Sequence, residues 1–100
     1  MSKITEELLA EFKERMKLSD EENDNLTRIL NASEQDLFDV CGRRDIVEDV
    51  VYKELVFERA RYVYNDALEY FERNFQSRIN KLAIEAAVKE TGDADATIQV

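Results

Sequence analysis

The chain offers few of the side chains on which catalysis depends. It contains no histidine, the residue that most often serves as a general base or zinc ligand. Its one cysteine, Cys41, stands directly before Gly42 with no base partner evident in the sequence, and we expect a buried, unreactive thiol. Two isolated glycines cannot form a glycine-rich phosphate-binding loop. We therefore expect neither an enzyme nor a cofactor.

A run of mostly acidic residues from Asp20 to Asp24 invites comparison with a calcium-binding loop. An EF-hand loop that began at Asp20 would need glycine where Asn25 stands and glutamate where Asn31 stands. Acids also favour the start of a helix, where the helix dipole is positive. The sequence therefore favours a solvated helix start over a metal site.

The segment from Glu58 to Ala67 gathers side chains of the kind that anchor protein–protein contacts, because tyrosine and arginine are enriched at interface hot spots. Arg59 and Asp66 stand two helical turns apart, so a continuous helix would place them on one face together with Tyr62. One interpretation is intrachain ion pairing with tyrosines at the edge of a core. The other is an interface. The candidate interface residues are Arg59, Arg61, Tyr62, Asn65 and Asp66.

Composition predicts a single all-α domain. The chain has 100 residues, of which 44% are hydrophobic and 37% charged, with no proline and two glycines. Because proline and glycine form many of the turns between strands, their scarcity argues against an all-β fold. The net charge of −9 disfavours a protein that grips nucleic acid, because an acidic surface repels phosphate.

The same composition predicts where such a chain resides. A single cysteine excludes a disulfide framework, and no apolar run approaches the roughly 18 residues of a membrane span. The N-terminal residues carry charge too early for a signal peptide. We therefore expect a soluble chain in a reducing cytoplasm, without a membrane partner.

Capping signals predict the first two helices of a small bundle of about four. Thr5 is the expected N-cap of the first helix, since two glutamates follow it. Ser19 and Glu22 have the spacing of a capping box for the second helix. Gly42 is expected to end that helix in a left-handed conformation.

The second half of the chain predicts one long central helix and a shorter final one. The long helix is expected to run from Asp45 to about Phe75, where the apolar pattern changes phase. Ser77 is then the expected cap of a helix that Gly92 closes. We expect residues 1–92 to form the domain and residues 93–100 a flexible tail.

The predicted long helix has more apolar surface than one neighbouring helix can cover. A second stripe needs another helix or another subunit. One face carries Val50, Phe57, Ala60, Tyr64, Ala67, Phe71 and Phe75, and the other carries Val51, Leu55 and Tyr62. We expect Phe57, Tyr64 and Phe71 to be largely buried within the monomer.

Two segments of the chain resemble a known family. They are NDNLTRILNA, from Asn23 to Ala32, and ERARYVYNDA, from Glu58 to Ala67. The residues of these two motifs and their order along the chain resemble those of the small head–tail connector (head-completion or adaptor) proteins of long-tailed bacteriophages and prophages. The resemblance covers residues 5–88, and its second motif is the more specific.

The resemblance implies a structural virion protein. Such a subunit would form a homo-oligomeric ring, expected to be a dodecamer, on the portal protein after DNA packaging. The ring would join head to tail by receiving a stopper or tail-completion protein, with DNA only as passing cargo. It would be made in the host bacterial cytoplasm and reside at the head–tail interface of the virion. The five candidate residues would then lie at a subunit or portal interface.

The residues and the resemblance agree on physical grounds. A helix with two apolar faces needs lateral neighbours, which a ring provides. An acidic surface suits a channel through which DNA slides without adhering. The residues leave one alternative open, a cytoplasmic helical adaptor or regulator that binds a partner helix in a groove.

Overall fold

The computed structural model describes residues 3–91 and contains four α-helices in that range. They are α1 (Glu6–Met16), α2 (Asn23–Val40), α3 (Val50–Tyr64) and α4 (Phe71–Thr91), with 3-10 turns η1 (Asp20–Glu22) and η2 (Leu68–Tyr70) preceding α2 and α4. These residues include no strand, so the predicted all-α fold and the number of helices are confirmed. None of the helices described is both long and apolar enough to cross a membrane.

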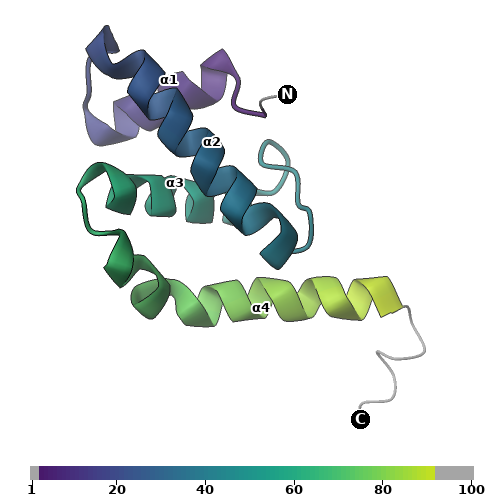
Figure 1. Cartoon of the computed structure of the whole chain (residues 1–100). Helices are drawn as coiled ribbons and strands as arrows, with labels where there is room; N and C mark the ends of the chain where they lie inside the picture. Colours follow the sequence, from purple (N-terminus) through teal and green to yellow (C-terminus); the bar gives the residue numbers. More distant parts are fainter. Residues whose placement is uncertain (1–2, 92–100) are drawn as a thin grey trace.

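Helix α3 lies at the centre of the bundle, between α2 and α4 (Figure 1). α2 crosses α3 on one side, with α1 packed behind its first half, and α4 runs along the other side. With 21 residues α4 is the longest of the described helices, and its C-terminal end continues past the bundle. The molecule is consequently elongated, with principal extents of 52 × 27 × 20 Å.

The start of the first helix is as predicted, and the start of the second differs. Thr5 Oγ1 accepts a hydrogen bond from Leu8 N at 3.2 Å, which confirms the N-cap. Ser19 Oγ instead accepts from Glu21 N at 3.4 Å, so the reciprocal capping box is not formed. A single turn of 3-10 helix follows, and α2 begins only at Asn23.

The end of α2 confirms the role predicted for Gly42. This glycine has φ 96°, a conformation that strains any side chain with a Cβ. Arg43 N donates to Phe38 O at 2.6 Å and Gly42 N donates to Asp39 O at 3.4 Å. These two bonds form a Schellman motif, which satisfies carbonyl groups that the helix end would otherwise leave open.

The start of α3 lies later than predicted. Asp45 caps an isolated turn, because its Oδ1 accepts from Val47 N at 2.8 Å. The helix begins at Val50, and its N-cap is Asp49, whose Oδ1 accepts from Tyr52 N at 3.0 Å. The sequence contains two acidic capping residues four positions apart, and the second one starts the helix.

The single helix predicted from Asp45 to Phe75 is wrong. α3 ends at Tyr64, and Asp66 adopts a left-handed conformation with φ 58°. Ala67 N then donates to Tyr62 O at 2.8 Å, which closes a second Schellman motif. Aspartate and asparagine reach this conformation more readily than most residues, so the break needs no glycine.

The predicted break at Ser77 is also wrong. Ser77 lies inside α4, which continues without interruption from Phe71 to Thr91. The helix is continuous because one apolar stripe at helical spacing faces the bundle along it, formed by Phe71, Phe75, Ile79, Leu82 and Ala86. The predicted helix end at Gly92 and the predicted tail at 93–100 lie outside the described residues.

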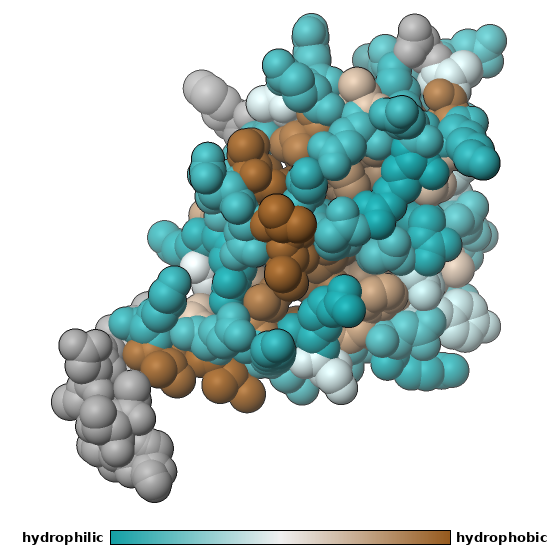
Figure 2. Space-filling model, turned by 180° about the vertical axis from the view of Figure 1, so that it is seen from behind, coloured by the Kyte–Doolittle hydropathy of each residue, from teal (hydrophilic) through white to brown (hydrophobic). Residues whose placement is uncertain are grey.

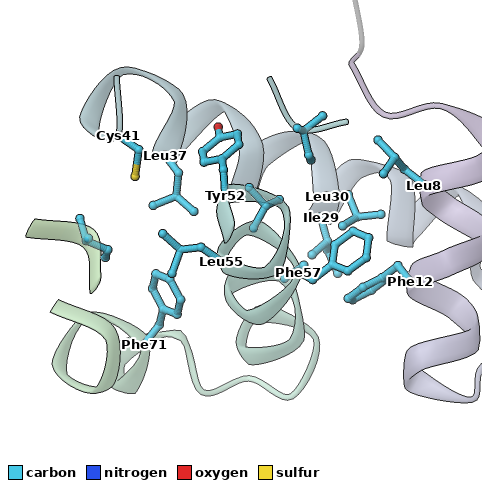
Figure 3. Packing of buried hydrophobic residues seen from close by; sticks show 14 of the residues in the cluster. Leu8, Phe12, Ile29, Leu30, Leu37, Cys41, Tyr52, Leu55, Phe57 and Phe71 are labelled. Atoms are coloured by element: carbon cyan, nitrogen blue, oxygen red, sulfur yellow. The ribbon is translucent and has the colours of Figure 1, made fainter. Parts of the chain in front are cut away.

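Buried apolar side chains form one core that runs the length of α3 (Figure 3). At one end Phe12 packs against Phe57, with ring centroids 5.3 Å apart. At the other end Leu37, Leu55 and Phe71 converge. The burial predicted for Phe57 and Phe71 is confirmed, since each is 1% exposed.

Two tyrosines reach the core with their hydroxyl groups satisfied. Tyr52 is fully buried and donates to Glu34 Oε2 at 2.9 Å, joining α3 to α2. Burial and the Glu34 carboxylate raise the pKa of Tyr52, so it remains a hydrogen-bond donor. Tyr64 is half-buried rather than largely buried as predicted, and it donates to Glu22 Oε2 at 2.7 Å.

Arg44 joins the middle of α4 to the rest of the fold. Its guanidinium donates to Cys41 O at 2.6 Å and to Leu82 O at 2.9 Å. It also pairs with Asp49 at 2.9 Å and with Glu85 at 3.4 Å. One side chain therefore links the end of α2, the start of α3 and α4.

The pairing of Asp49 predicts a loss of stability in acid. Partial burial opposes ionisation, but the Tyr52 amide and the Arg44 guanidinium prevail and hold the pKa of Asp49 below its ordinary value. Such a carboxylate stabilises the fold above its unfolded-state pKa and loses this effect as pH falls through the folded-state pKa. In thermal unfolding at a series of pH values, Asp49→Asn should therefore flatten the decline in Tm below about pH 4.

The exposed carboxylate Asp66 provides a matched control for this measurement, because it lies outside the helices and asparagine tolerates its backbone conformation. Asp66→Asn should keep the wild-type dependence of Tm on pH. An Asp49→Asn profile parallel to that of the wild type would contradict the role given to the Arg44–Asp49 pair.

Candidate interaction surface

Arg59 faces α2, and its hydrogen bond and ion pair are both with that helix. Its Nη1 donates to Ser33 Oγ at 3.0 Å, and its Nε pairs with Asp36 Oδ2 at 3.2 Å. Only 14% of the side chain is exposed. Arg59 therefore holds α3 against α2, and the pair with Asp66 expected from their spacing is replaced by the pair with Asp36.

Tyr62 joins α3 to α4. Its ring packs edge-on against Phe71 and Phe75, with centroids 5.8 Å away in each case. Its hydroxyl accepts a hydrogen bond from Asn74 Nδ2 at 2.9 Å. The half-buried ring is thus part of the α3–α4 contact, as expected for a tyrosine at the edge of a core.

Arg61 lies beside Tyr62 on α3. Its guanidinium donates to Glu58 Oε1 at 2.8 Å and lies 5.1 Å from the centroid of the Tyr62 ring. The hydrogen bond that Arg61 donates to the Glu58 carboxylate is the main reason that the pKa of Arg61 is raised. These contacts support the intrachain interpretation of Arg61.

Asn65 and Asp66 are the exposed members of the set. Both lie in the connection between α3 and η2, beyond the last helical residue, Tyr64. The single face predicted for Arg59, Tyr62 and Asp66 is therefore not formed, because the helix ends before Asp66. A role of the five residues in a subunit or portal interface stays a prediction.

The structure has a groove between α2, η2 and the first half of α4, and the sequence did not predict this surface. Its volume is about 390 Å³, and Arg59 lies in its wall. Three carboxylates and one arginine line it, so the lining has a negative charge. We call this surface the acidic groove, lined by Asp36, Leu37, Val40, Arg59, Leu68, Glu69, Phe71, Glu72, Gln76 and Ile79.

The outer side of α4 presents a second missed surface. Ser77, Lys81, Ile84 and Val88 occur at i, i+4, i+7 and i+11, which places them on one face of the helix. All four are exposed, Ile84 by 63% and Val88 by 44%. We call them the α4 stripe. From behind, Figure 2 shows hydrophobic atoms on the part of the molecule that leads to the grey C-terminal residues.

A third surface lies at the start of α3. Val47, Val50 and Val51 are each at least half exposed, and we call them the valine surface. Val50 and Val51 belong to the two apolar faces predicted for the long helix. Leu55 and Phe57 of those faces are buried within the chain, whereas Val50 and Val51 stay exposed. Val47 lies in the turn before α3, and Val50 and Val51 are the first two residues of that helix.

Groups suited to catalysis or metal binding are sparse in the described part of the chain. Cys41 is fully buried, which confirms that prediction, and burial raises the pKa of its thiol. A thiol in this state is a poor nucleophile. Among residues 3–91, no group of three or more acidic or cysteine side chains is placed to hold a metal ion.

A scan of protein-family models finds no match to this chain, and searches of curated proteins and of solved structures find none. The resemblance to connector proteins therefore depends on the two sequence motifs alone. Function is inferred from them and from the surfaces of the molecule.

Proposed function

We propose that this chain is a structural subunit that assembles with copies of itself, as a head–tail connector of a long-tailed bacteriophage. The subunits form a ring on the portal after DNA packaging and join head to tail. The observation that carries the proposal is the apolar surface on α4, where Ile84 and Val88 are exposed on a helix that extends past the bundle.

This observation favours assembly because apolar side chains that gather on one surface are a mark of protein–protein interaction sites. Burying them against another protein is favourable by about 25 cal/mol per Å² of apolar area. The valine surface adds a second apolar area on a different helix. A subunit in a ring has neighbours on two sides and a portal beneath, so such a ring uses several contact surfaces at once.

The charge of the chain also fits a connector. With a net charge of −9, the protein repels the DNA phosphates. DNA that passes through a ring of such subunits would therefore slide without binding. The partners implied are other copies, the portal protein and a stopper or tail-completion protein, at the head–tail interface of the virion.

Binding to purified portal rings and to DNA-filled heads tests this proposal. We expect the wild-type chain to cosediment with both, and electron microscopy of the bound particles should reveal an added ring. A chain that binds neither would overturn the proposal. Asp66→Lys tests the site prediction separately, because Asp66 is exposed and Lys17 already adopts the same backbone conformation with φ 59°.

We expect Asp66→Lys to weaken portal binding while leaving the thermal unfolding of the monomer close to that of the wild type. Glu14→Lys is the matched control, since it makes the same charge change at an exposed site in the last turn of α1. If Asp66→Lys binds as well as this control, only the assignment of Asp66 to an interface fails.

The alternative is a cytoplasmic adaptor or regulator, and the acidic groove is the feature that favours it. A groove with apolar walls and carboxylates at its edge fits an amphipathic helix with basic residues. This alternative replaces the connector if the chain binds neither portal nor heads.

A further inference from the structure

We propose that the α4 stripe of one copy docks into the acidic groove of a second copy. This inference specifies the self-contact on which the proposed ring depends. The two surfaces have complementary chemistry, because the stripe offers two aliphatic side chains and a lysine, whereas the groove has apolar walls and an excess of carboxylates.

The groove has the apolar surface that this contact needs. Two of its lining residues are exposed: Val40, the last residue of α2, by 50%, and Leu68, the first residue of η2, by 38%. Its volume of about 390 Å³ accommodates aliphatic side chains such as those of Ile84 and Val88. The contact would bury apolar groups that both surfaces now expose to water.

The carboxylates of the groove are available to a basic partner. Asp36 already pairs with Arg59. Glu69 and Glu72 are exposed, and within residues 3–91 neither side chain has an ion pair. Lys81 in the stripe is likewise exposed and makes no ion pair with the described residues. Docking would bring Lys81 toward Glu69 or Glu72, which favours this register over others.

Charge also decides which surfaces meet. Two stripes facing each other would bring Lys81 of one copy against Lys81 of the other, and two grooves would bring carboxylates together. Stripe against groove is the pairing that opposes unlike charges. Glu72 of the groove and Ile84 of the stripe belong to the same rigid helix and lie on different faces of it. A stripe therefore cannot enter the groove of its own chain.

A contact of this kind is head-to-tail. Each copy that joins leaves one stripe and one groove open, so further copies can add until the assembly closes. Because the two surfaces differ, a head-to-tail contact can be distinguished by experiment from a symmetric two-fold contact. A variant with a broken stripe retains its groove, and a variant with a broken groove retains its stripe.

Ile84→Asp breaks the stripe and Leu68→Asp breaks the groove. Both positions are exposed, and Leu68 opens η2, so both variants should retain the circular dichroism spectrum and thermal unfolding of the wild type. In sedimentation and native mass spectrometry at millimolar concentration, we expect wild-type oligomers. Each variant alone should be monomeric, with its self-affinity reduced roughly tenfold or more. An equimolar mixture should form a one-to-one dimer that does not grow.

Ala10→Asp is the matched control, because it places the same charge at an exposed position on α1, outside the α4 stripe, the acidic groove and the valine surface. It should associate as the wild type does. Lys81→Glu should weaken association, and Lys81→Arg should retain it. A wild-type chain that stays monomeric at millimolar concentration, or a mixture of Ile84→Asp and Leu68→Asp that forms no dimer, would overturn the inference.

These outcomes are separable from those of the portal assay. If the wild type binds portal but the two variants form no mixed dimer, the assignment of the contact surfaces fails and the connector function stands. If mixed dimers form but the wild type binds neither portal nor heads, the self-contact stands and the connector function fails.

Discussion

Replacing Phe71 with alanine is expected to reduce the free energy of unfolding by about 3–5 kcal/mol. The Phe71 ring is 1% exposed and stacks on Phe75 with a centroid distance of 5.1 Å. It also receives the edge of Tyr62. Phe71 is the first residue of α4, and removing its ring leaves a cavity where α3, α4 and η2 meet. Urea denaturation, with the slope compared between variants, measures the change.

The neighbouring residue Tyr70 gives the control for this prediction. Tyr70 is 45% exposed, so Tyr70→Ala should change the free energy of unfolding by no more than about 1 kcal/mol. If Phe71→Ala unfolds at the same urea concentration as Tyr70→Ala, the side of α4 that faces the core has been assigned wrongly.

Gly42→Ala is expected to produce the second large loss of stability, through two separate causes. The φ of 96° disfavours any side chain, by roughly 1–2 kcal/mol. A Cβ at this position would also lie 2.2 Å from the Cβ of Ala86 on α4, and relieving such an overlap costs roughly 1–3 kcal/mol. Urea denaturation of the variant should reveal the sum of these effects.

A double-mutant cycle separates the two causes. Ala86→Gly removes the overlapping methyl group but leaves the backbone of Gly42→Ala strained. On its own, Ala86→Gly should cost about 1 kcal/mol, from the lower helix propensity of glycine. The loss of stability measured for the double variant should be smaller than the sum of the losses of the two single variants. The difference should equal roughly the overlap energy. Simple additivity would mean that the approach of the loop to α4 does not contribute.

The sequence predicted several features that local signals determine, although the capping box at Ser19 and the helix start at Asp45 were wrong. Thr5 and Gly42 act through hydrogen bonds to residues within one helical turn or through their own backbone, and both were placed correctly. The break at Asp66 was missed because an aspartate fills a position where glycine was the expected signal. The pair Asn65-Asp66 was the available clue, since both residue types tolerate a left-handed backbone.

Contacts between distant segments could not be predicted in the same way. Arg59 can pair with an acid on its own helix or on a neighbouring one, and its choice of Asp36 depends on how α2 crosses α3. The α4 stripe is visible as a helical repeat, but its exposure depends on which side of α4 meets the bundle. The acidic groove combines residues from four elements, α2, α3, η2 and α4, so no single stretch of sequence contains it.

The order of the helices has a consequence for how the chain folds. The elements that approach most closely in space are neighbours along the sequence, from α1 with α2 to α3 with η2 and α4. Chains rich in such local contacts close short loops first and commonly fold in microseconds to milliseconds. A subunit with exposed aliphatic surface benefits from this speed, because unfinished chains that expose still more apolar surface are the ones that aggregate. The connectivity that gives the groove its shape thus also shortens the time during which newly made copies can associate wrongly.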